Sequence, residues 1–363
     1  MRNYGRKRAL SALAIFSFIV TGISLVLLII AKSSVVAADF LNSTVSYGYR
    51  RVMAAFGELF PFSLFELLLA LLPIIIIVVV ILAIRAFKSG GGLRFVINFV
   101  AVLLLFYSGN VIALGIGYNT TTVDKRIGFD ICEVNKDNLA EVMTALRDEV
   151  NALCPLIEYD ENGISTPDYT LGESGEIICD AYKSVSEKYG FLGDFSSTPK
   201  GVDLLNIMSY LSLGGIYTYY TGEANVNIDY PMYDVVFTAG HELSHQRGVM
   251  RENEANFMAY FVLSSSPDTY LRYSAALNMY SYISSALYRT DPELYYSIAE
   301  GLDARALSDL RASSAVSREY GDTILSDISN FVNDLFLKSH GTDGVVTYGR
   351  VVTLTVSYFE SKK

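Results

Sequence analysis

Three long apolar runs in the first third of the chain constrain its fold most strongly. They cover about residues 9–31, 64–84 and 95–117, and each is long enough as a helix to cross a hydrocarbon core of roughly 30 Å. A cleaved signal peptide is the alternative interpretation of the first run, but its apolar stretch exceeds the roughly 7 to 15 residues usual for such peptides. The sequence therefore predicts a membrane domain, residues 1–117, with three transmembrane helices in a lipid bilayer.

Basic residues predict the orientation of these helices. Seven of them precede the first run or lie between the second and third, and two oppose this pattern between the first and second: Arg2, Arg6, Lys7, Arg8, Arg85, Lys88 and Arg94 against Arg50 and Arg51. Because basic loops tend to remain in the cytoplasm, we expect a cytoplasmic N-terminus. Everything after residue 117 then lies outside.

Residues 118–363 form a second region that differs in charge. Only 3 of the 38 Asp and Glu residues precede residue 118, but 10 of the 28 Lys and Arg residues do, so the first region carries a net charge of +7 and the second −17. Such an acidic surface argues against nucleic acid as a partner, and we expect no organic cofactor. The pairing of Cys132, Cys154 and Cys179 stays open, and a buried free thiol is the simplest expectation for each.

The pattern of the second region is mostly helical. Apolar residues at helical spacing predict helices over residues 135–154 and 174–190, and helices dominate from residue 232 to about 337. Residues 215–231 are rich in tyrosine and β-branched side chains and are broken by a glycine, which predicts a short strand or hairpin. Residues 344–359 fit either a strand or a helix. The fold class is a mainly α membrane protein with an α-rich α+β outer domain.

The second apolar run begins with the stretch "PFSLFE". An acidic residue this close to an apolar run is a candidate functional group within the membrane. However, Ser63 stands three residues before Glu66, which is the spacing of a reciprocal capping box at a helix start. We therefore interpret Glu66 as a capping residue.

Two of the three histidines lie four residues apart in "HELSHQRG", residues 241–248. The residues before them predict a helix that ends at Gly248, so His241 and His245 project to the same side, one turn apart. Two imidazoles in this arrangement can bind one Zn²⁺ at about 2.0 to 2.1 Å each. Glu242 can then take a proton from a water molecule at the metal. We predict His241 and His245 as metal ligands and Glu242 as the catalytic base.

A catalytic zinc site needs a third protein ligand and one open position. Arg251 stands where an HExxHxxGxxH protein would supply another histidine, so a carboxylate must serve. The stretch "RENEANFMAYFVLSSS" predicts a second helix, on which Glu252 shares a face with Asn256 and small residues, whereas Glu254 shares its face with core residues. We prefer Glu252 as the ligand and keep Glu254 as the alternative. Asn256 is placed to hydrogen-bond a ligating histidine.

Two further groups are candidates for substrate or oxyanion contacts. The stretch "YYTGEANVN", with Glu223 and Asn225, could supply an edge strand along which an extended peptide lies, or it could be a plain surface hairpin. Hydrolysis also requires a group that stabilises the developing oxyanion. The polar candidates are His340, Tyr348 and Arg350.

These motifs carry a resemblance to known families. HExxH followed by Glu-x-x-x-Asn on a second helix resembles the gluzincin arrangement of thermolysin and of membrane-bound peptidases of the CAAX-processing and HtpX types, with a shorter gap between His245 and Glu252. In this order, "PFSLFE", "TGEANVN", "HELSHQRG", "ENEANFMAY" and "YGRVV" resemble the bacterial membrane family catalogued as domain of unknown function 3810. The resemblance covers nearly the whole chain. It implies a zincin-like metallopeptidase domain, residues 118–363, outside a bacterial cell membrane.

The function expected from the sequence is zinc-dependent hydrolysis of peptide bonds. Zinc bound by His241, His245 and Glu252 lowers the pKa of its water toward about 7, and Glu242 transfers the proton to the leaving amine. Envelope proteins or peptides are the expected substrates. A zinc-binding membrane sensor and a structural envelope protein without turnover are the alternatives, although a structural zinc needs no base and is usually closed by four ligands.

Overall fold

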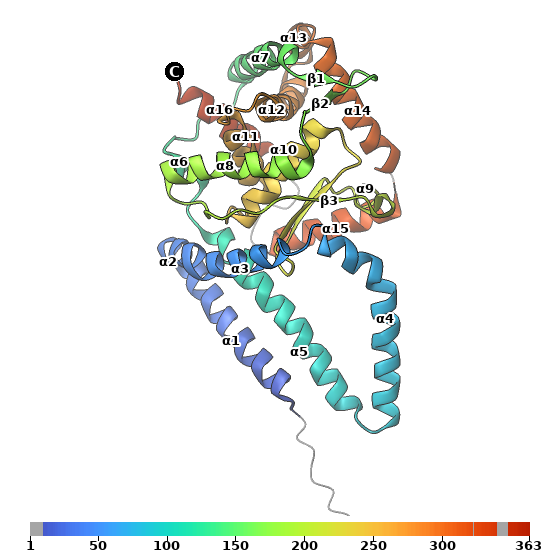
Figure 1. Ribbon diagram of the computed structural model, residues 1–363. Helices are drawn as coiled ribbons and strands as arrows, with labels where there is room; N and C mark the ends of the chain where they lie inside the picture. Colours follow the sequence, from blue (N-terminus) through green and yellow to red (C-terminus); the bar gives the residue numbers. More distant parts are fainter. Residues whose placement is uncertain (1–9, 322, 340–347) are drawn as a thin grey trace, which may run out of the picture.

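The protein has three apolar helices that project from a larger helical domain, as the computed structural model shows for residues 10–321, 323–339 and 348–363 (Figure 1). The segments long and apolar enough to cross a membrane are Ala12–Ser33 (α1), Leu64–Lys88 (α4) and Gly92–Asn119, whose first part is α5 (Gly92–Asn110). These segments confirm the prediction of three apolar helices. Helix α4 ends four residues beyond the predicted 84, because Arg85 and Lys88 occupy its last turn, where basic side chains complement the helix dipole.

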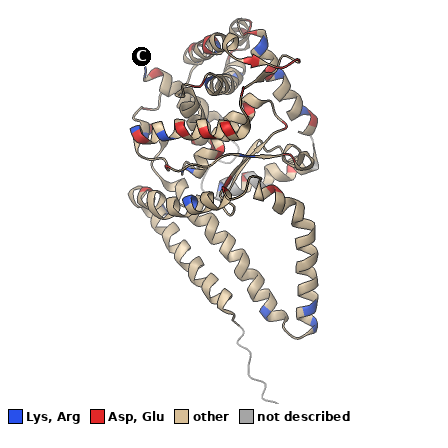
Figure 2. Cartoon of the chain, viewed as in Figure 1, with Lys and Arg blue, Asp and Glu red and all other residues tan. Residues whose placement is uncertain are grey.

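Helices α1 and α5 pack side by side, whereas α4 diverges from α5 after the loop that joins them (Figure 1). Small polar residues allow the close packing: the Ser17 hydroxyl donates to the Ala101 carbonyl at 2.6 Å, and the hydroxyls of Thr21 and Ser108 are 3.0 Å apart. The three helices carry charged residues only in their first or last turns. Acidic residues are spread over residues 118–363, which we call the outer domain because it lies beyond one end of the apolar helices (Figure 2).

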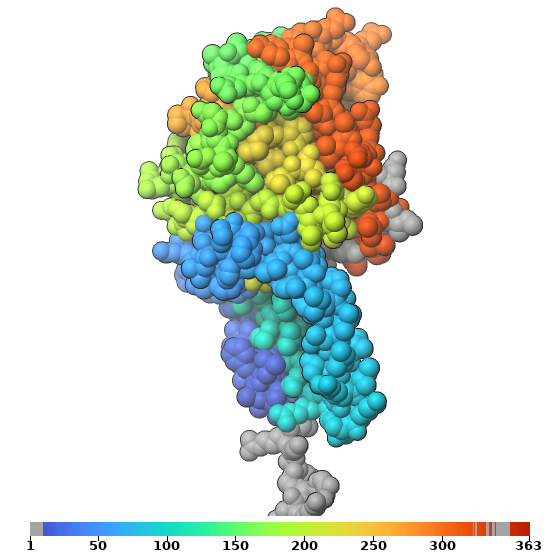
Figure 3. Space-filling model, turned by 45° about the vertical axis from the view of Figure 1, so that its right-hand side comes forward, coloured from blue at the N-terminus to red at the C-terminus, as the bar shows by residue number. Residues whose placement is uncertain are grey.

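The segment between the first two apolar helices is folded and packs against the outer domain. It contains α2 (Val35–Leu41), a π-helical turn (Asn42–Ser46) and α3 (Tyr47–Gly57). In the space-filling view these residues form a layer between the apolar helices and the outer domain (Figure 3). The predicted division at residue 117 placed this segment in the membrane domain. In the structure the segment also contacts the second domain, so the two predicted domains are joined by contacts on both sides of it.

Arg50 shows how closely the segment is joined to its surroundings. Only 1% of the residue is exposed, and its guanidinium donates to the side chain and backbone of Asn42 and to the Ala113 carbonyl at 2.9 to 3.0 Å. Burial lowers the pKa of Arg50 to about 10, so the side chain stays charged at neutral pH. Arg50 therefore lies in a folded segment and not in an open loop, and the orientation of the apolar helices stays a prediction.

The outer domain consists mainly of helices around a buried centre. They are α6 (Val123–Ile127), α7 (Lys136–Leu153), α8 (Leu171–Tyr189), α9 (Ile207–Tyr210), α10 (Met232–Gln246), α11 (Glu252–Ser264), α12 (Thr269–Thr290), α13 (Pro292–Ala299), α14 (Ala304–Tyr320), α15 (Ile324–Ser339) and α16 (Tyr348–Glu360). Helices α10, α11 and α12 form the centre, and almost every residue of α11 is buried. Helix α16 resolves the ambiguity over residues 344–359 for its part of that range. Cys132, Cys154 and Cys179 are free thiols.

A three-stranded sheet lies beside α10. Its strands are β3 (Lys200–Val202), β4 (Gly215–Thr218) and β5 (Glu223–Asn227), in the order β3-β5-β4, with β5 parallel to β3 and antiparallel to β4. A separate pair is formed by β1 (Glu158–Tyr159) and β2 (Ser165–Thr166). The predicted hairpin is confirmed. The expectation that its second strand forms the edge is wrong, because β3 covers the far side of β5, and β4 is the edge strand next to α10.

The two faces of β5 contact different parts of the protein, because successive side chains of a strand point to opposite faces. Ala224 and Val226 belong to the core with α10. On the other face, the Glu223 carboxylate accepts the N–H groups of Leu64 and Phe65 at 2.8 and 3.1 Å. These are amides at the start of α4, which otherwise have no intrahelical partner. The sheet therefore joins α10 to the second apolar helix.

The capping box predicted at the start of α4 is only half formed. The Ser63 hydroxyl accepts the N–H of Glu66 at 2.9 Å, as expected. The Glu66 carboxylate does not return to Ser63, and it accepts instead the N–H groups of Asp203 and Leu204 at 2.8 and 2.7 Å. The Ser63 hydroxyl donates to the Asn225 side chain at 2.7 Å. The Glu66 carboxylate therefore binds the outer domain in place of the Ser63 backbone, and these contacts hold the start of α4 against that domain.

Candidate metal centre

The turn between α10 and α11 returns the chain so that the two helices lie side by side. Gly248 has φ +107°, which disfavours any residue with a side chain. An added Cβ there would lie 2.8 Å from Nη2 of Arg50, and the Gly248 carbonyl accepts from the Asn42 side chain at 3.1 Å. Helix α11 begins at Glu252, so the turn places the first residue of α11 beside the last turns of α10.

His241, His245 and Glu252 form one cluster. Their nearest atoms are separated by 3.0 Å between the two Nε2 atoms, 3.2 Å from His241 Nε2 to the Glu252 carboxylate and 3.5 Å from His245 Nε2 to its second oxygen. Ligands at 2.0 to 2.1 Å from a tetrahedral zinc ion are about 3.3 Å apart. The cluster therefore has the size of a zinc coordination sphere. The Glu252 side chain is 34% exposed, so solvent reaches the cluster from one side.

The partners of the two imidazoles determine which nitrogen faces the cluster. His245 Nδ1 is 2.8 Å from the carbonyl oxygen of Val249, and His241 Nδ1 is 2.9 Å from the side-chain oxygen of Asn256. Both oxygens accept, so each Nδ1 carries the hydrogen and each Nε2 of a neutral ring presents a lone pair. Two lone pairs and a carboxylate converge on one point, an arrangement that only a cation or a proton can stabilise.

Glu254 lies outside the cluster. Its carboxylate accepts from Nη1 of Arg251 at 3.0 and 3.1 Å, and Arg251 in turn donates to the carbonyl oxygens of Tyr118 and Thr120 at 2.9 and 2.7 Å. Glu254 and Arg251 therefore tie the start of α11 to the end of the third apolar helix. Glu252, not Glu254, is the carboxylate that faces the histidines.

Glu242 lies between the cluster helix and the edge strand β4. It is 4% exposed, and the backbone N–H of Tyr217 is directed at its carboxylate. An added Cβ at Gly215 would lie 2.5 Å from Oε1 of Glu242. Gly215 and Tyr217 contact Glu242 and were not predicted from the sequence. The glycine pair at residues 214 and 215, where β4 begins, is the local signal for a close approach, but nothing in the sequence links it to Glu242.

Burial and neighbouring charges perturb the acid–base groups. Burial raises the pKa of the Glu242 carboxyl, and the imidazoles of His241 and His245 lower it only in part. Burial alone would lower the pKa of His245, but the carboxylates of Glu252 and Glu242 raise it to about 9. Burial alone would also raise the pKa of Glu252, but the two imidazoles hold it well below its ordinary value. Without a metal ion, the cluster therefore retains a proton at neutral pH.

The remaining candidates are placed elsewhere or are not described. Glu223 and Asn225 are buried on the face of β5 opposite α10, where they contact the start of α4. Tyr348 begins α16, and Arg350 is exposed in the first turn of that helix, which packs on α7, α11 and α12. His340 lies outside the described residues.

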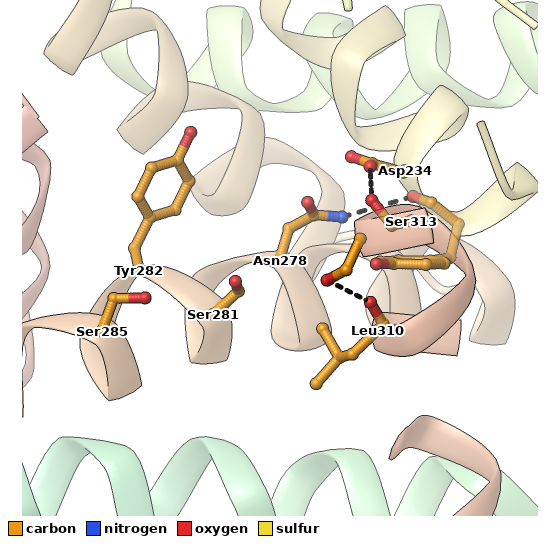
Figure 4. Close-up of a pocket in the computed structure, with 9 residues that line it drawn as sticks. Asp234, Asn278, Ser281, Tyr282, Ser285, Leu310 and Ser313 are labelled. Atoms are coloured by element: carbon orange, nitrogen blue, oxygen red, sulfur yellow. Dashed lines mark hydrogen bonds between the residues drawn. The ribbon is translucent and has the colours of Figure 1, made fainter. Parts of the chain in front are cut away.

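A surface cavity of about 300 Å³ lies at the other end of α10, between that helix, α12 and α14 (Figure 4). Its lining includes Asp234 and Asn278, and the Ser313 hydroxyl donates to Asp234 at 2.6 Å. Burial raises the pKa of Asp234. The cavity contains none of the cluster residues, so it is separate from the candidate metal centre.

The chain belongs to the family described as "Protein of unknown function (DUF3810)", which it matches over residues 42–356. This match confirms the resemblance to that family and covers most of the chain, including the folded segment between the first two apolar helices. No curated protein and no solved structure matches the chain. An activity must therefore be argued from the site itself.

Proposed function

We propose that this protein is a zinc metallopeptidase, held by its three apolar helices in a bacterial cell membrane, that hydrolyses peptide bonds of envelope proteins or peptides outside that membrane. One observation carries the proposal. The lone pairs of His241 and His245 and the carboxylate of Glu252 converge with the spacing of zinc ligands, while Glu242 is buried beside them. A purely structural zinc site would need no such additional carboxylate.

The residues present can divide the steps of hydrolysis among them. A zinc ion at the cluster supplies polarisation of the scissile carbonyl and activation of a water molecule. Glu242 takes the proton from water and passes it to the leaving amine, and its raised pKa suits a group that must both accept and donate a proton near neutral pH. Asn256 and the Val249 carbonyl hold the imidazole rings in orientation through their Nδ1–H groups.

The edge strand β4 offers a binding surface for an extended peptide. The Gly214 carbonyl accepts from the Asn227 N–H of β5. Because the backbone groups of an antiparallel strand alternate in direction, those of Ile216 also face β5, whereas those of Gly215 and Tyr217 point to the outer edge. That edge has no strand partner among the described residues, and the Tyr217 N–H is directed at Glu242 there. A peptide paired there would pass next to Glu242.

The experiment that tests the proposal measures zinc and cleavage together. The detergent-purified protein is analysed for zinc per chain and incubated with a peptide library, in parallel with Glu242→Gln and a control, Glu176→Gln, at an exposed position of α8. We expect zinc in all three proteins, and cleavage about 100-fold or more slower in Glu242→Gln alone. Zinc without cleavage by any of the three would refute the enzyme and favour the sensor or structural alternative. Absence of zinc would refute the metal centre.

A further inference from the structure

We infer that the peptide bonds cleaved at this site lie in segments next to the membrane, about five residues from the point where the substrate's own membrane-embedded segment leaves the bilayer. This inference rests on the proposed function and names the substrate class of the same site. Three features support it: the cluster lies close to the ends of the apolar helices, β4 runs from the cluster toward those helices, and the outer domain exposes apolar residues on the side that faces them.

The cluster is attached directly to the outer ends of the apolar helices. An added Cβ at Gly117, near the end of the third apolar segment, would lie 2.4 Å from the Met250 side chain. Arg251 donates to the Tyr118 carbonyl at 2.9 Å in the same segment. Both contacts involve the turn between α10 and α11, the two helices that carry the candidate metal ligands. The candidate active site therefore lies immediately above the ends of the membrane segments.

The edge strand β4 runs from this site toward the membrane part. Gly215, at its start, contacts Glu242, whereas the tip that follows its end packs on the third apolar helix. The ring centroids of Tyr220 and Phe106 are 5.8 Å apart, and the Tyr219 ring is 3.2 Å from the position of a Cβ at Gly109. Figure 1 shows the tip of this hairpin between the outer ends of α4 and α5.

The spacing along β4 sets the length of substrate that the site can reach. Strand β4 covers Gly215–Thr218, which is about 10 Å at about 3.3 Å per residue, and Tyr219 and Tyr220 follow in the turn, so the path from Gly215 to Tyr220 is at most about 16 Å long. Tyrosine is enriched where protein crosses the boundary between bilayer and water, and Tyr219 and Tyr220 contact the third apolar helix near such a boundary. A peptide paired with β4 would therefore enter the bilayer about five residues beyond the bond at Glu242.

The outer domain also exposes apolar residues on its membrane side, near the start of α4. The Glu66 carboxylate accepts from Asp203 and Leu204, and the next residue, Leu205, is 81% exposed with φ +51°. A leucine in the left-handed region that also exposes its side chain is costly in water. Contact with lipid beside α4 would bury this side chain.

Helix α15 continues this apolar surface. Its start is fixed to the same region, because the Thr323 hydroxyl donates to the Tyr210 carbonyl at 3.1 Å and the rings of Tyr210 and Tyr320 are 4.9 Å apart. Large apolar side chains at helical spacing are 49 to 68% exposed on one face: Leu325, Ile328, Phe331 and Leu335. The helix lies across the direction of the apolar helices (Figure 1). A helix in this position is suited to lie in the bilayer surface.

The experiment compares substrates that differ only in distance from a membrane segment. The protein is reconstituted in vesicles together with single-span substrates whose cleavable sequence, chosen from the peptide library, lies about 5, 15 or 30 residues from the span. The first spacing matches the reach of β4 and the other two exceed it. The same sequence is also offered as a soluble peptide. We expect the substrate with the shortest spacing to be cut at least about tenfold faster than the other two tethered substrates.

The outcomes separate this inference from the proposed function. Equal rates at all three spacings would overturn the inference and leave the peptidase intact. Cleavage of none of the substrates, including the soluble peptide, would overturn both. A variant gives an independent readout: Tyr220→Ser should reduce the preference for the shortest spacing about threefold to fivefold while soluble-peptide cleavage is retained, because it removes a contact of about 0.6 to 1 kcal/mol. The matched control is Tyr296→Ser on α13, at a residue 56% exposed.

Discussion

Zinc binding should release a proton from the cluster, and the structure gives its source. The pKa of His245 is raised to about 9, so nearly every metal-free molecule carries that proton at pH 7. An imidazole must lose its extra proton to bind a metal ion, so each zinc ion displaces about one proton. The apparent zinc affinity should therefore rise about tenfold per pH unit, or about 100-fold between pH 6 and pH 8, and level off above pH 9.

The folding stability of the metal-free protein should change with pH in the opposite direction to the zinc affinity. A folded-state pKa above the ordinary value of 6.5 means that protonated His245 stabilises the fold. This contribution, about 3 kcal/mol for the 2.5-unit shift, is fully present below pH 6.5 and is lost as the pH rises through 9. Metal-free protein should therefore unfold at lower denaturant concentration at pH 9.5 than at pH 6.

Two measurements check the proton release. Competition with a chelating dye gives the zinc affinity from pH 6 to pH 8, and calorimetry in buffers of different ionisation enthalpy gives the number of protons released. Glu242→Gln is the control for the other perturbed acid, and it should still release about one proton. An affinity that does not change with pH, or a binding enthalpy independent of the buffer, would refute the reasoning. If Glu242→Gln no longer released a proton on binding zinc, the proton would come from Glu242 and not from His245.

Two further predictions concern the surroundings of the cluster, and a third concerns helix α15. Replacing Asn256 by leucine removes the acceptor of an imidazole hydrogen, so the zinc affinity measured with the dye should fall about 10- to 100-fold, and an unchanged affinity would contradict the role of the amide. Gly215→Ala places a methyl group against the predicted base, so library-peptide cleavage should fall about tenfold or more with zinc retained, whereas Gly214→Ala should cleave normally. A fluorophore attached at Ile328 in a cysteine-free variant should be quenched by brominated lipids more strongly than one at Asn330, and equal quenching would place α15 away from the bilayer.

The parts of the fold that could be predicted are those with a local pattern. The apolar runs predicted three long helices, and the glycine at 248 predicted the end of the HExxH helix. The hairpin of residues 215–227 also followed from its composition and its turn glycine. Whether His241, His245 and Glu252 bind zinc stays a prediction, although the structure brings the three side chains together.

The parts that could not be predicted depend on contacts between distant residues. The position of β5 in the sheet is set by β3, a strand of three residues without a recognisable pattern. Glu66 has a plausible local partner in Ser63, but its carboxylate binds backbone amides 137 and 138 residues away. The contact between Gly215 and Glu242 likewise joins two elements whose separate sequences do not indicate it. Local spacing carries no information on such partners.

The buried guanidinium of Arg50 has a consequence for how the chain assembles. Its hydrogen-bond acceptors include Ala113, and Asn42, which orients the group, donates to Gly248. During synthesis, Arg50 is made long before Ala113 and Gly248. Its guanidinium therefore lacks part of its hydrogen-bonding environment until the third apolar helix and the α10–α11 turn have formed. Enclosing it earlier would leave a charge without partners, which is strongly unfavourable. The apolar helices and the outer domain are therefore completed together, and the three apolar helices could not be exchanged for another membrane anchor.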